Sequence, residues 1–230
     1  MADTIGEVLV TDLVVRSAPG VGADSEILEG RLTLGDTVYV IEGPVQASGY
    51  AWFLVAEIAE LREAPSLGWI AQASREGEPW VRRTEPPCPD EISVEALASV
   101  AESLRLFCFG GQELTLDGEI QPFCGQTDPV IQDPSWLGNY GCAFSAPDRP
   151  DAVSDWPAIS VHFDPQRMGG GPPFTGPAQI VGRHDAPVAQ ACHYSESSQG
   201  VANLTELDQR MLVFRCRASF VVESATPLAP

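Results

Sequence analysis

Twenty prolines and 21 glycines are spread along this chain of 230 residues, and they constrain its fold more than any other feature. Proline removes a backbone donor and glycine destabilises the interior of helices and strands, so long uninterrupted elements are not expected. Apolar residues still make up 44% of the sequence, enough for the cores of two domains of ordinary size. We therefore predict a mainly β protein of short strands and loops, with one or two short helices.

The charge of the chain is strongly negative and its cations are of one kind. All 13 basic residues are arginine, against 32 acidic residues, which gives a formal net charge of −19. Such a surface repels phosphate backbones and anionic lipids, so we expect neither nucleic acid nor a membrane as a partner. Without lysine, Schiff-base catalysis and a P-loop lysine are excluded. No apolar run is long enough for a membrane-spanning helix.

The cysteines form an even set, confined to residues 88 to 216. This pattern is typical of disulfides in an oxidising compartment, so we expect an extracellular or cell-envelope protein whose leader or anchor is absent from this chain. The alternative is a cytosolic protein with buried free thiols. The six residues are Cys88, Cys108, Cys124, Cys142, Cys192 and Cys216.

Sequence alone does not choose among the possible cysteine pairings, but it ranks them. Cys124 and Cys142 flank an expected loop, and closing a loop of that size stabilises a fold by roughly 3 kcal/mol in the chain-entropy model. They are the first predicted pair. The second prediction places Cys108 and Cys216 on core-facing strand positions that meet across a barrel. Cys88 is then left to pair with Cys192.

Residues 1–83 contain short strand-like segments separated by turn signals at roughly ten-residue spacing, which indicates a small barrel. The expected strands include residues 13–20, 36–44, 49–58 and 67–72, and Gly43-Pro44 is expected to end the second of them.

The order of these segments resembles the bacterial SH3-like domain, often called SH3b, over Glu7 to Val81. The resemblance implies a non-catalytic barrel of envelope and secreted proteins that often binds cell-wall peptides. The matching pieces are "LVVRSAPG" at 13–20, "LGDTVYVIEGP" at 34–44, "GYAWFLV" at 49–55, "GWI" at 68–70 and "EGEPWV" at 76–81.

A proline-rich junction, residues 84–92, separates this domain from a second one at 93–230. Ser93 is expected to cap an amphipathic helix over 93–106, and residues 118–157 are expected to form a long loop. Five predicted strands suit a small barrel, of which the OB-like type is one choice. These strands cover residues 104–109, 112–120, 158–163, 178–184 and 210–225. The pattern resembles a module that follows SH3-like domains in bacterial envelope proteins, for which no activity is implied.

The stretch "GRHDAPVAQACHY" at 182–194 gathers His184, Asp185, Cys192 and His193. Zinc sites usually show close ligand pairs, and none occurs, so we predict no metal and no other cofactor. A catalytic thiol would stand apart from an even set. We therefore predict a strand, a turn, a short helix and a disulfide. Asp164 and Asp185 each follow a strand, and we expect them to cap the next turn.

The aromatic residues of the first domain offer the best candidate ligand surface. Tyr50, Trp52 and Trp80 lie beside glycine or proline near strand ends and are predicted to bind a ligand, whereas Trp69 is expected in the core. The chain is thus predicted to be a non-catalytic binding or adaptor protein, with a cell-wall peptide or another extracellular protein as its ligand. Two alternatives stay open. One is a hydrolase of cell-wall material with an acid pair among Asp164, Asp185 and their neighbours, and the other is a structural subunit that pairs through edge strands.

Overall fold

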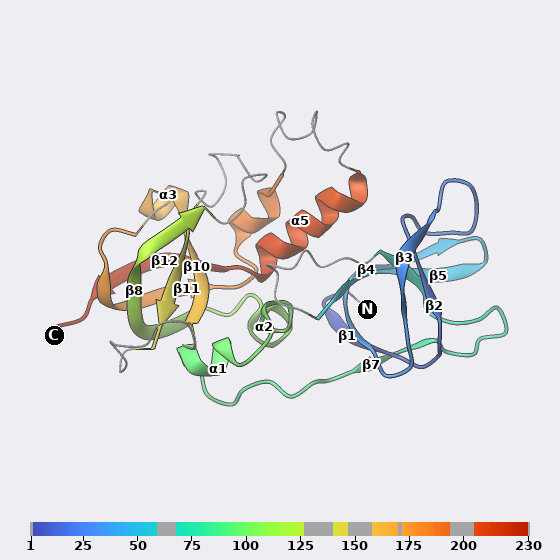
Figure 1. Cartoon of the computed structure of the whole chain (residues 1–230), viewed down its shortest axis with the longest axis horizontal. Helices are drawn as coiled ribbons and strands as arrows, with labels where there is room; N and C mark the ends of the chain where they lie inside the picture. Colours follow the sequence, from blue (N-terminus) through green and yellow to red (C-terminus); the bar gives the residue numbers. More distant parts are fainter. Residues whose placement is uncertain are drawn as a thin grey trace. The chain divides into compact units, whose positions relative to one another are not determined.

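The computed structural model describes residues 2–58, 68–126, 140–146, 158–169, 172–193 and 205–229, with the side chains of 122–141 and 165 left aside. The chain divides into two compact units, Met1–Pro87 and Cys88–Pro230, and the division falls within the predicted junction 84–92. Both units are built mainly of strands, as the sequence indicates (Figure 1).

The first unit is a curled antiparallel sheet of seven strands in the order β3-β2-β6-β5-β4-β1-β7. Backbone hydrogen bonds from Trp80 and Val81 to the Gln72 carbonyl, at 2.8 and 3.1 Å, tie the start of β7 to the residue after β6. The strands are β1 (Thr4–Val8), β2 (Leu13–Arg16), β3 (Ile27–Leu32), β4 (Thr37–Ala47), β5 (Tyr50–Glu57), β6 (Trp69–Ala71) and β7 (Val81–Thr84).

Alternate residues of these strands point to opposite faces of the sheet, and the inward ones form the core of the first unit. On β5, for example, Phe53 and Val55 belong to the core cluster. The predicted core residue Trp69 is buried, with 5% of its surface exposed. Inward residues from the other strands complete this cluster, among them Val8, Val15, Val38, Val40, Ile70 and Val81.

Strand β4 does not end at Gly43-Pro44, so that prediction was wrong. The strand continues to Ala47, and its register against β5 shifts on both sides of Glu42. Such a bulge accommodates proline because its missing N–H is not needed in the ladder there. Gly43 is required at this position, since a Cβ would lie 2.6 Å from the Phe53 ring and 2.7 Å from the Trp52 carbonyl oxygen.

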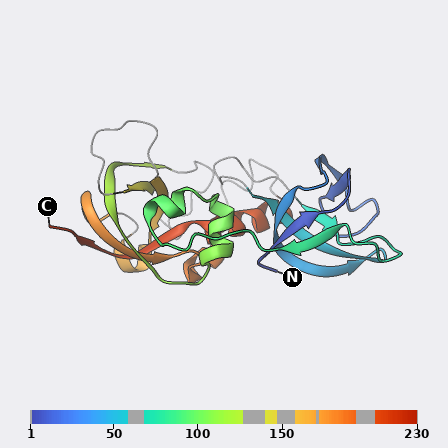
Figure 2. The same ribbon diagram turned by 90° about the horizontal axis from the view of Figure 1, so that it is seen from below.

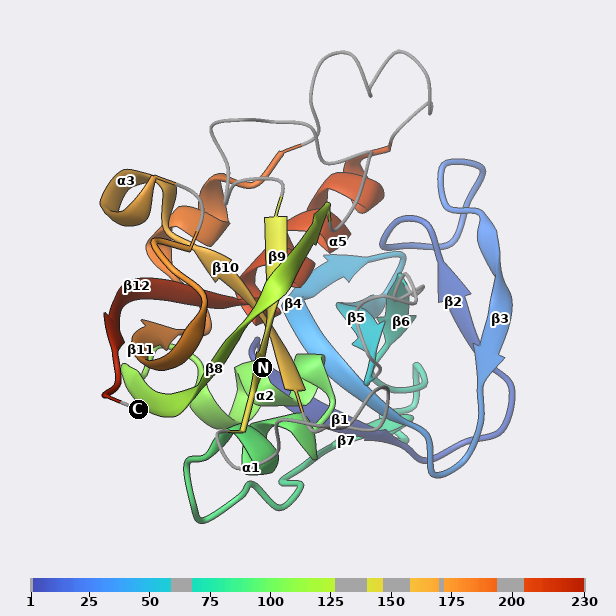
Figure 3. The ribbon, with the colours of Figure 1, turned by 60° about the vertical axis from the view of Figure 1, so that its left-hand side comes forward.

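The second unit contains a closed barrel in the order β10-β12-β11-β8-β9. Helices α3 (Pro165–Met168) and α5 (Glu206–Ala218) lie outside the strand ladder (Figure 3). Strand β9 pairs with β8 and β10, β10 pairs in parallel with β12, and β11 pairs with β12 and β8. This connectivity is that of the predicted OB-like barrel. The strands are β8 (Leu114–Gln126), β9 (Tyr140–Ser145), β10 (Ala158–Phe163), β11 (Gly176–Arg183) and β12 (Phe220–Pro227).

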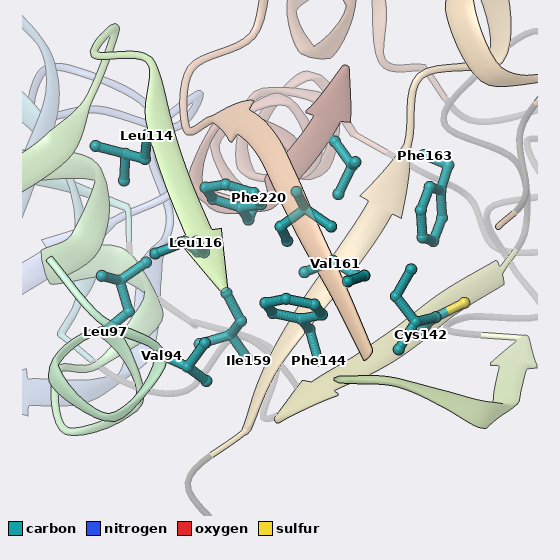
Figure 4. Close-up of a cluster of buried hydrophobic side chains, with 14 of the residues drawn as sticks. Val94, Leu97, Leu114, Leu116, Cys142, Phe144, Ile159, Val161, Phe163 and Phe220 are labelled. Atoms are coloured by element: carbon teal, nitrogen blue, oxygen red, sulfur yellow. The ribbon is translucent and has the colours of Figure 1, made fainter. Parts of the chain in front are cut away.

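The barrel interior is filled by aromatic and branched side chains that point toward one another (Figure 4). Phe144, Val161 and Phe220 are at most 1% exposed. Helix α1 (Val94–Ala98) contacts β8, β9 and β10 and adds Val94 and Leu97 to the same cluster. The predicted capping is confirmed, because the Ser93 hydroxyl accepts a hydrogen bond from the Ala96 amide at 3.1 Å.

The segment predicted as a strand at 104–109 is instead part of helix α2 (Glu102–Phe109), which follows α1 beside the barrel (Figure 2). One predicted helix is thus two, separated at Ser99 to Ala101. Arg105 explains the break physically. Its buried guanidinium Nε donates to the carbonyls of Leu97 and Val100, at 2.6 and 2.8 Å, and so satisfies acceptors at the end of α1.

The predicted strand at 210–225 is also wrong in its first half, which belongs to helix α5 (Glu206–Ala218). Thr205 and Asp208 form a reciprocal capping box at its start, and Glu206 pairs with Arg210 one turn later at 2.7 Å. Arg215 and Arg217 lie in the last turn, where cations are favourable. Cys216 is buried, as predicted, but on a helix.

The segment expected to be one long loop, residues 118–157, contains strands. It includes the second half of β8 and all of β9, and residues 127–139 and 147–157 lie outside the described part of the chain. The register of these strands places Cys124 opposite Cys142. Cys142 forms a disulfide. The Cys124 side chain is not among those described, so the predicted pair stays a prediction.

Two disulfides differ from the predicted pairing. Cys88 is bonded to Cys108, and Cys192 to Cys216, so the proposed Cys108–Cys216 and Cys88–Cys192 pairs are wrong. The reason is that residues 108 and 216 both lie on helices outside the barrel ladder, where they cannot meet across its interior. The Cys192–Cys216 disulfide joins α5 to the 3-10 helix η1 (Pro187–Ala191), whereas Cys88–Cys108 joins the interdomain junction to α2.

Peptide mapping of the unreduced protein by mass spectrometry should therefore find Cys88 linked to Cys108 and Cys192 linked to Cys216. Replacing Cys192 and Cys216 together by alanine should lower the free energy of unfolding of the second unit by roughly 3 kcal/mol, as expected for a loop of this length. Amide hydrogen exchange reports on the two units separately, and the amides of the cysteine-free first unit should exchange as slowly in this variant as in the native protein. A Cys88–Cys192 linked peptide would contradict the assignment.

Candidate functional site

A groove of about 350 Å³ lies in the first unit, on the outward side of β2, β6 and β5. Figure 3 shows these three strands. Val14 and Arg16 line it from β2, and Ala71 lines it from the end of β6. These residues alternate with the inward Val15 and Ile70. Leu13 and Trp80 line the groove too, although Leu13 belongs to the core cluster and Trp80 packs against it. The volume falls within the range of small-ligand sites.

Tyr50, Trp52 and Trp80, the three predicted ligand residues, all line this groove. Tyr50 and Trp80 are half-buried and stack with their ring centroids 6.1 Å apart at an interplanar angle of 30°. Trp52 meets Tyr50 edge to face at 5.9 Å and is only 3% exposed. The structure therefore brings the three rings together, with Tyr50 and Trp80 as the accessible wall and Trp52 beneath them.

Local backbone geometry holds this wall in place. Ser48 and Gly49 both have positive φ, 52° and 81°, as a two-residue hairpin turn requires, so Tyr50 enters β5 directly after the turn. The Trp52 indole N–H donates to the Ala47 carbonyl on the other side of the hairpin at 2.9 Å. Trp80 donates its backbone N–H to Gln72 and accepts from the Leu9 amide at 2.9 Å.

The opposite lip of the groove comes from two loops. Val21, which is 53% exposed, donates its amide to the Ser48 hydroxyl at 2.9 Å, so this loop is attached to the same hairpin turn as Tyr50. Asp12 stands at the other loop with φ of 57°, a left-handed conformation that aspartate tolerates better than most residues. The groove thus offers apolar side chains, one carboxylate and one guanidinium.

The sequence did not predict that Val14, Arg16, Asp12 and Val21 line the groove. A signal for two of them was present, because the alternation of "LVVR" places Val14 and Arg16 on the face opposite Leu13 and Val15. No pattern in the sequence indicated that the loop carrying Val21 returns to the β4–β5 turn.

The cluster at 182–194 has a structural role. Cys192 is bonded to Cys216, and the Asp185 carboxylate accepts two hydrogen bonds from the Arg217 guanidinium, at 2.7 and 3.1 Å. Asp185 does not cap η1, which corrects that prediction, because Ala186 is the cap residue and provides no side-chain bond. His193 is exposed. The predicted strand, turn, short helix and disulfide are all present.

Asp164 does cap the following turn, as predicted. Its carboxylate accepts from the amides of Gln166 and Arg167, at 2.8 and 3.2 Å, at the start of α3 (Pro165–Met168). Asp164 and Asp185 are thus both engaged in local contacts. Among the described residues, no three histidine, cysteine, aspartate or glutamate side chains gather closely enough to hold a metal ion.

His184 is a buried ionisable side chain whose pKa is strongly shifted. It is 1% exposed, and its Nδ1 lies 2.7 Å from the Ala218 carbonyl oxygen at the end of α5. Burial lowers the pKa of His184 from 6.5 to about 4, with a smaller contribution from the Arg105 cation. The ring is therefore neutral at pH 7, and it packs edge to face on Phe220 with centroids 5.3 Å apart.

This burial predicts acid sensitivity of the second unit. The unfolded chain takes up a proton at His184 below about pH 6.5 whereas the folded chain does not until about pH 4, so stability falls between these values. The shift corresponds to about 3 kcal/mol. Urea unfolding at pH 7 and pH 4.5 should show a smaller acid-induced loss for His184→Gln than for the native protein. His193→Gln is the matched control, and an unchanged loss in His184→Gln would contradict the prediction.

Comparisons with known proteins give this site no precedent: no family model matches the chain, and neither a curated protein nor a solved structure matches it.

Proposed function

We propose that the protein is a non-catalytic binding module of the cell envelope or the extracellular space, and that the groove of the first unit holds its ligand. The observation that carries this proposal is the convergence of Tyr50, Trp52 and Trp80 on one concave surface. Aromatic side chains with few rotatable bonds supply large contact areas at low entropic cost and dominate many binding sites.

The shape and chemistry of the groove favour an extended peptide. Its wall is a stacked pair of rings, and apolar side chains of its lining alternate with polar ones such as Thr11, Asp12 and Arg16. Peptide-binding grooves commonly combine such aromatic walls with a few orienting polar groups. The resemblance of residues 7–81 to SH3b domains supports the same class of ligand, namely a cell-wall peptide.

The cysteine chemistry supports the proposed location. Cys88, Cys108, Cys142, Cys192 and Cys216 are all disulfide-bonded, as is characteristic of proteins that fold in an oxidising compartment. Among the helices that the structure describes, none combines the length and the apolar character needed to cross a membrane.

The proposal predicts that the protein sediments with purified bacterial peptidoglycan and that the groove is responsible. Tyr50→Ala and Trp80→Ala should each weaken binding by about thirtyfold, the effect of losing an aromatic anchor worth about 2 kcal/mol. The measurement is the bound fraction as a function of peptidoglycan concentration.

Leu34→Ala is the matched control, since Leu34 is 63% exposed in the same unit but does not line the groove. It should bind like the native protein. Circular dichroism should show that all variants are folded. Binding that survives both aromatic substitutions would overturn the role of the groove, and release of soluble fragments from the peptidoglycan would indicate a hydrolase instead.

A further inference from the structure

Some arginines of this acidic protein form ion pairs with carboxylates and others do not. Among the residues that the structure describes, arginines in both units pair with acidic side chains, as Arg82 does with Glu7 and Arg217 with Asp185, each at 2.7 Å. Arg16, Arg31 and Arg75 form no such pair within the described part of the chain. Since acidic residues outnumber arginines 32 to 13, an unpaired arginine is unexpected here.

These three arginines lie on or beside the groove. Arg16 lines it. The guanidinium carbon of Arg75 lies 5.2 Å from the centroid of Tyr50, one of the wall rings. Arg31 is the cross-strand partner of Val14, a groove residue, and directly opposite residues on paired strands point to the same face. In the described part of the chain, these three arginines without a carboxylate partner therefore gather at the groove.

Arg16 is also held in a fixed position. Its Nη1 donates to the Ser25 carbonyl at 2.6 Å, and the Ser25 hydroxyl donates to Ala18 at 2.6 Å, so the guanidinium is anchored at the groove and keeps other N–H groups for a ligand. An anchored guanidinium binds a carboxylate with less loss of side-chain entropy than a mobile one.

We infer that the groove takes the C-terminal end of an extended, otherwise uncharged peptide, with its terminal carboxylate on Arg16 and an apolar side chain on the Tyr50–Trp80 wall. This inference rests on the proposed function and adds the chemical class of the ligand.

The other charges around the groove favour a ligand with only one carboxylate. Asp12 lines the same groove, and the whole chain carries a net charge of −19, so a ligand with several acidic groups is repelled. One carboxylate is compensated by the charge-assisted hydrogen bonds of Arg16, whereas a second one would meet Asp12. Asp12 can instead accept a hydrogen bond from a peptide N–H. These features favour a chain terminus over an acidic side chain within a charged sequence.

The test is an array of random tetrapeptides without aspartate or glutamate, attached through their N-termini and presented either as free acids or as C-terminal amides. The native protein should bind a subset of free acids with an apolar residue near the terminus. The corresponding amides should bind at least tenfold more weakly, as expected for the loss of a charge-assisted pair. Arg16→Gln should abolish this difference, and Arg16→Lys should retain part of it.

Arg83→Gln is the matched control, since it removes one positive charge from the same unit at a residue paired with Glu85, and it should bind like the native protein. If Arg16→Gln is not folded by circular dichroism, Asp12→Asn provides a second test, because it should let the groove accept peptides with one additional internal glutamate.

The outcomes separate this inference from the proposed function. Equal binding of acids and amides, lost in Trp80→Ala, would overturn the carboxylate assignment and leave a peptide-binding groove. Binding confined to peptides with internal acidic side chains in a second array would overturn the choice of a chain terminus. If no peptide binds while peptidoglycan still sediments the protein through Tyr50 and Trp80, the inference fails and the proposed function stands.

Discussion

The hydrogen bond from the Trp52 indole to the Ala47 carbonyl is the contact on which the groove depends. It joins the two strands of the β4–β5 hairpin next to the turn, and this turn carries both Tyr50 and the Ser48 hydroxyl that holds the Val21 loop. A large aromatic side chain on the outward face of a sheet would normally be exposed. Trp52 is buried there because the stacked rings and the loop cover it.

In the second unit, a comparable role belongs to the contacts that fix α5. The Cys192–Cys216 disulfide and the Asp185–Arg217 ion pair attach the last turns of this helix to the end of β11 and to η1. Strand β12 follows α5 after Ser219 and lies between β10 and β11 in the barrel. The position of α5 therefore determines where the last barrel strand begins, and His184 is enclosed at this junction.

The mainly β class, the small barrel of the second unit and the convergence of the three aromatic residues could be predicted because strand alternation and turn residues are local signals. The errors at 104–109 and 210–218 arose where apolar residues alternate within helices. There, Leu104 to Phe109 and Leu212 to Ala218 fit a strand as well as a helix. For the second segment, the capping box at Thr205 and Asp208 was a local signal for a helix. The predicted cysteine pairs Cys108–Cys216 and Cys88–Cys192 relied on the same strand assignment and were therefore wrong as well.

Arg16 could have been placed on the groove face from the sequence, but its lack of a carboxylate partner depends on tertiary contacts that no sequence pattern contains.

The division of β2 and β6 into an inward and an outward face has an evolutionary consequence. Val15 and Ile70 maintain the core, whereas Val14, Arg16 and Ala71 line the groove from adjacent positions on the same strands. Substitutions at the outward positions change the lining of the groove without opening a cavity in the core. Under the proposed function, ligand preference and stability can therefore diverge separately at these positions, whereas selection on either property acts on Leu13, which lines the groove and belongs to the core cluster.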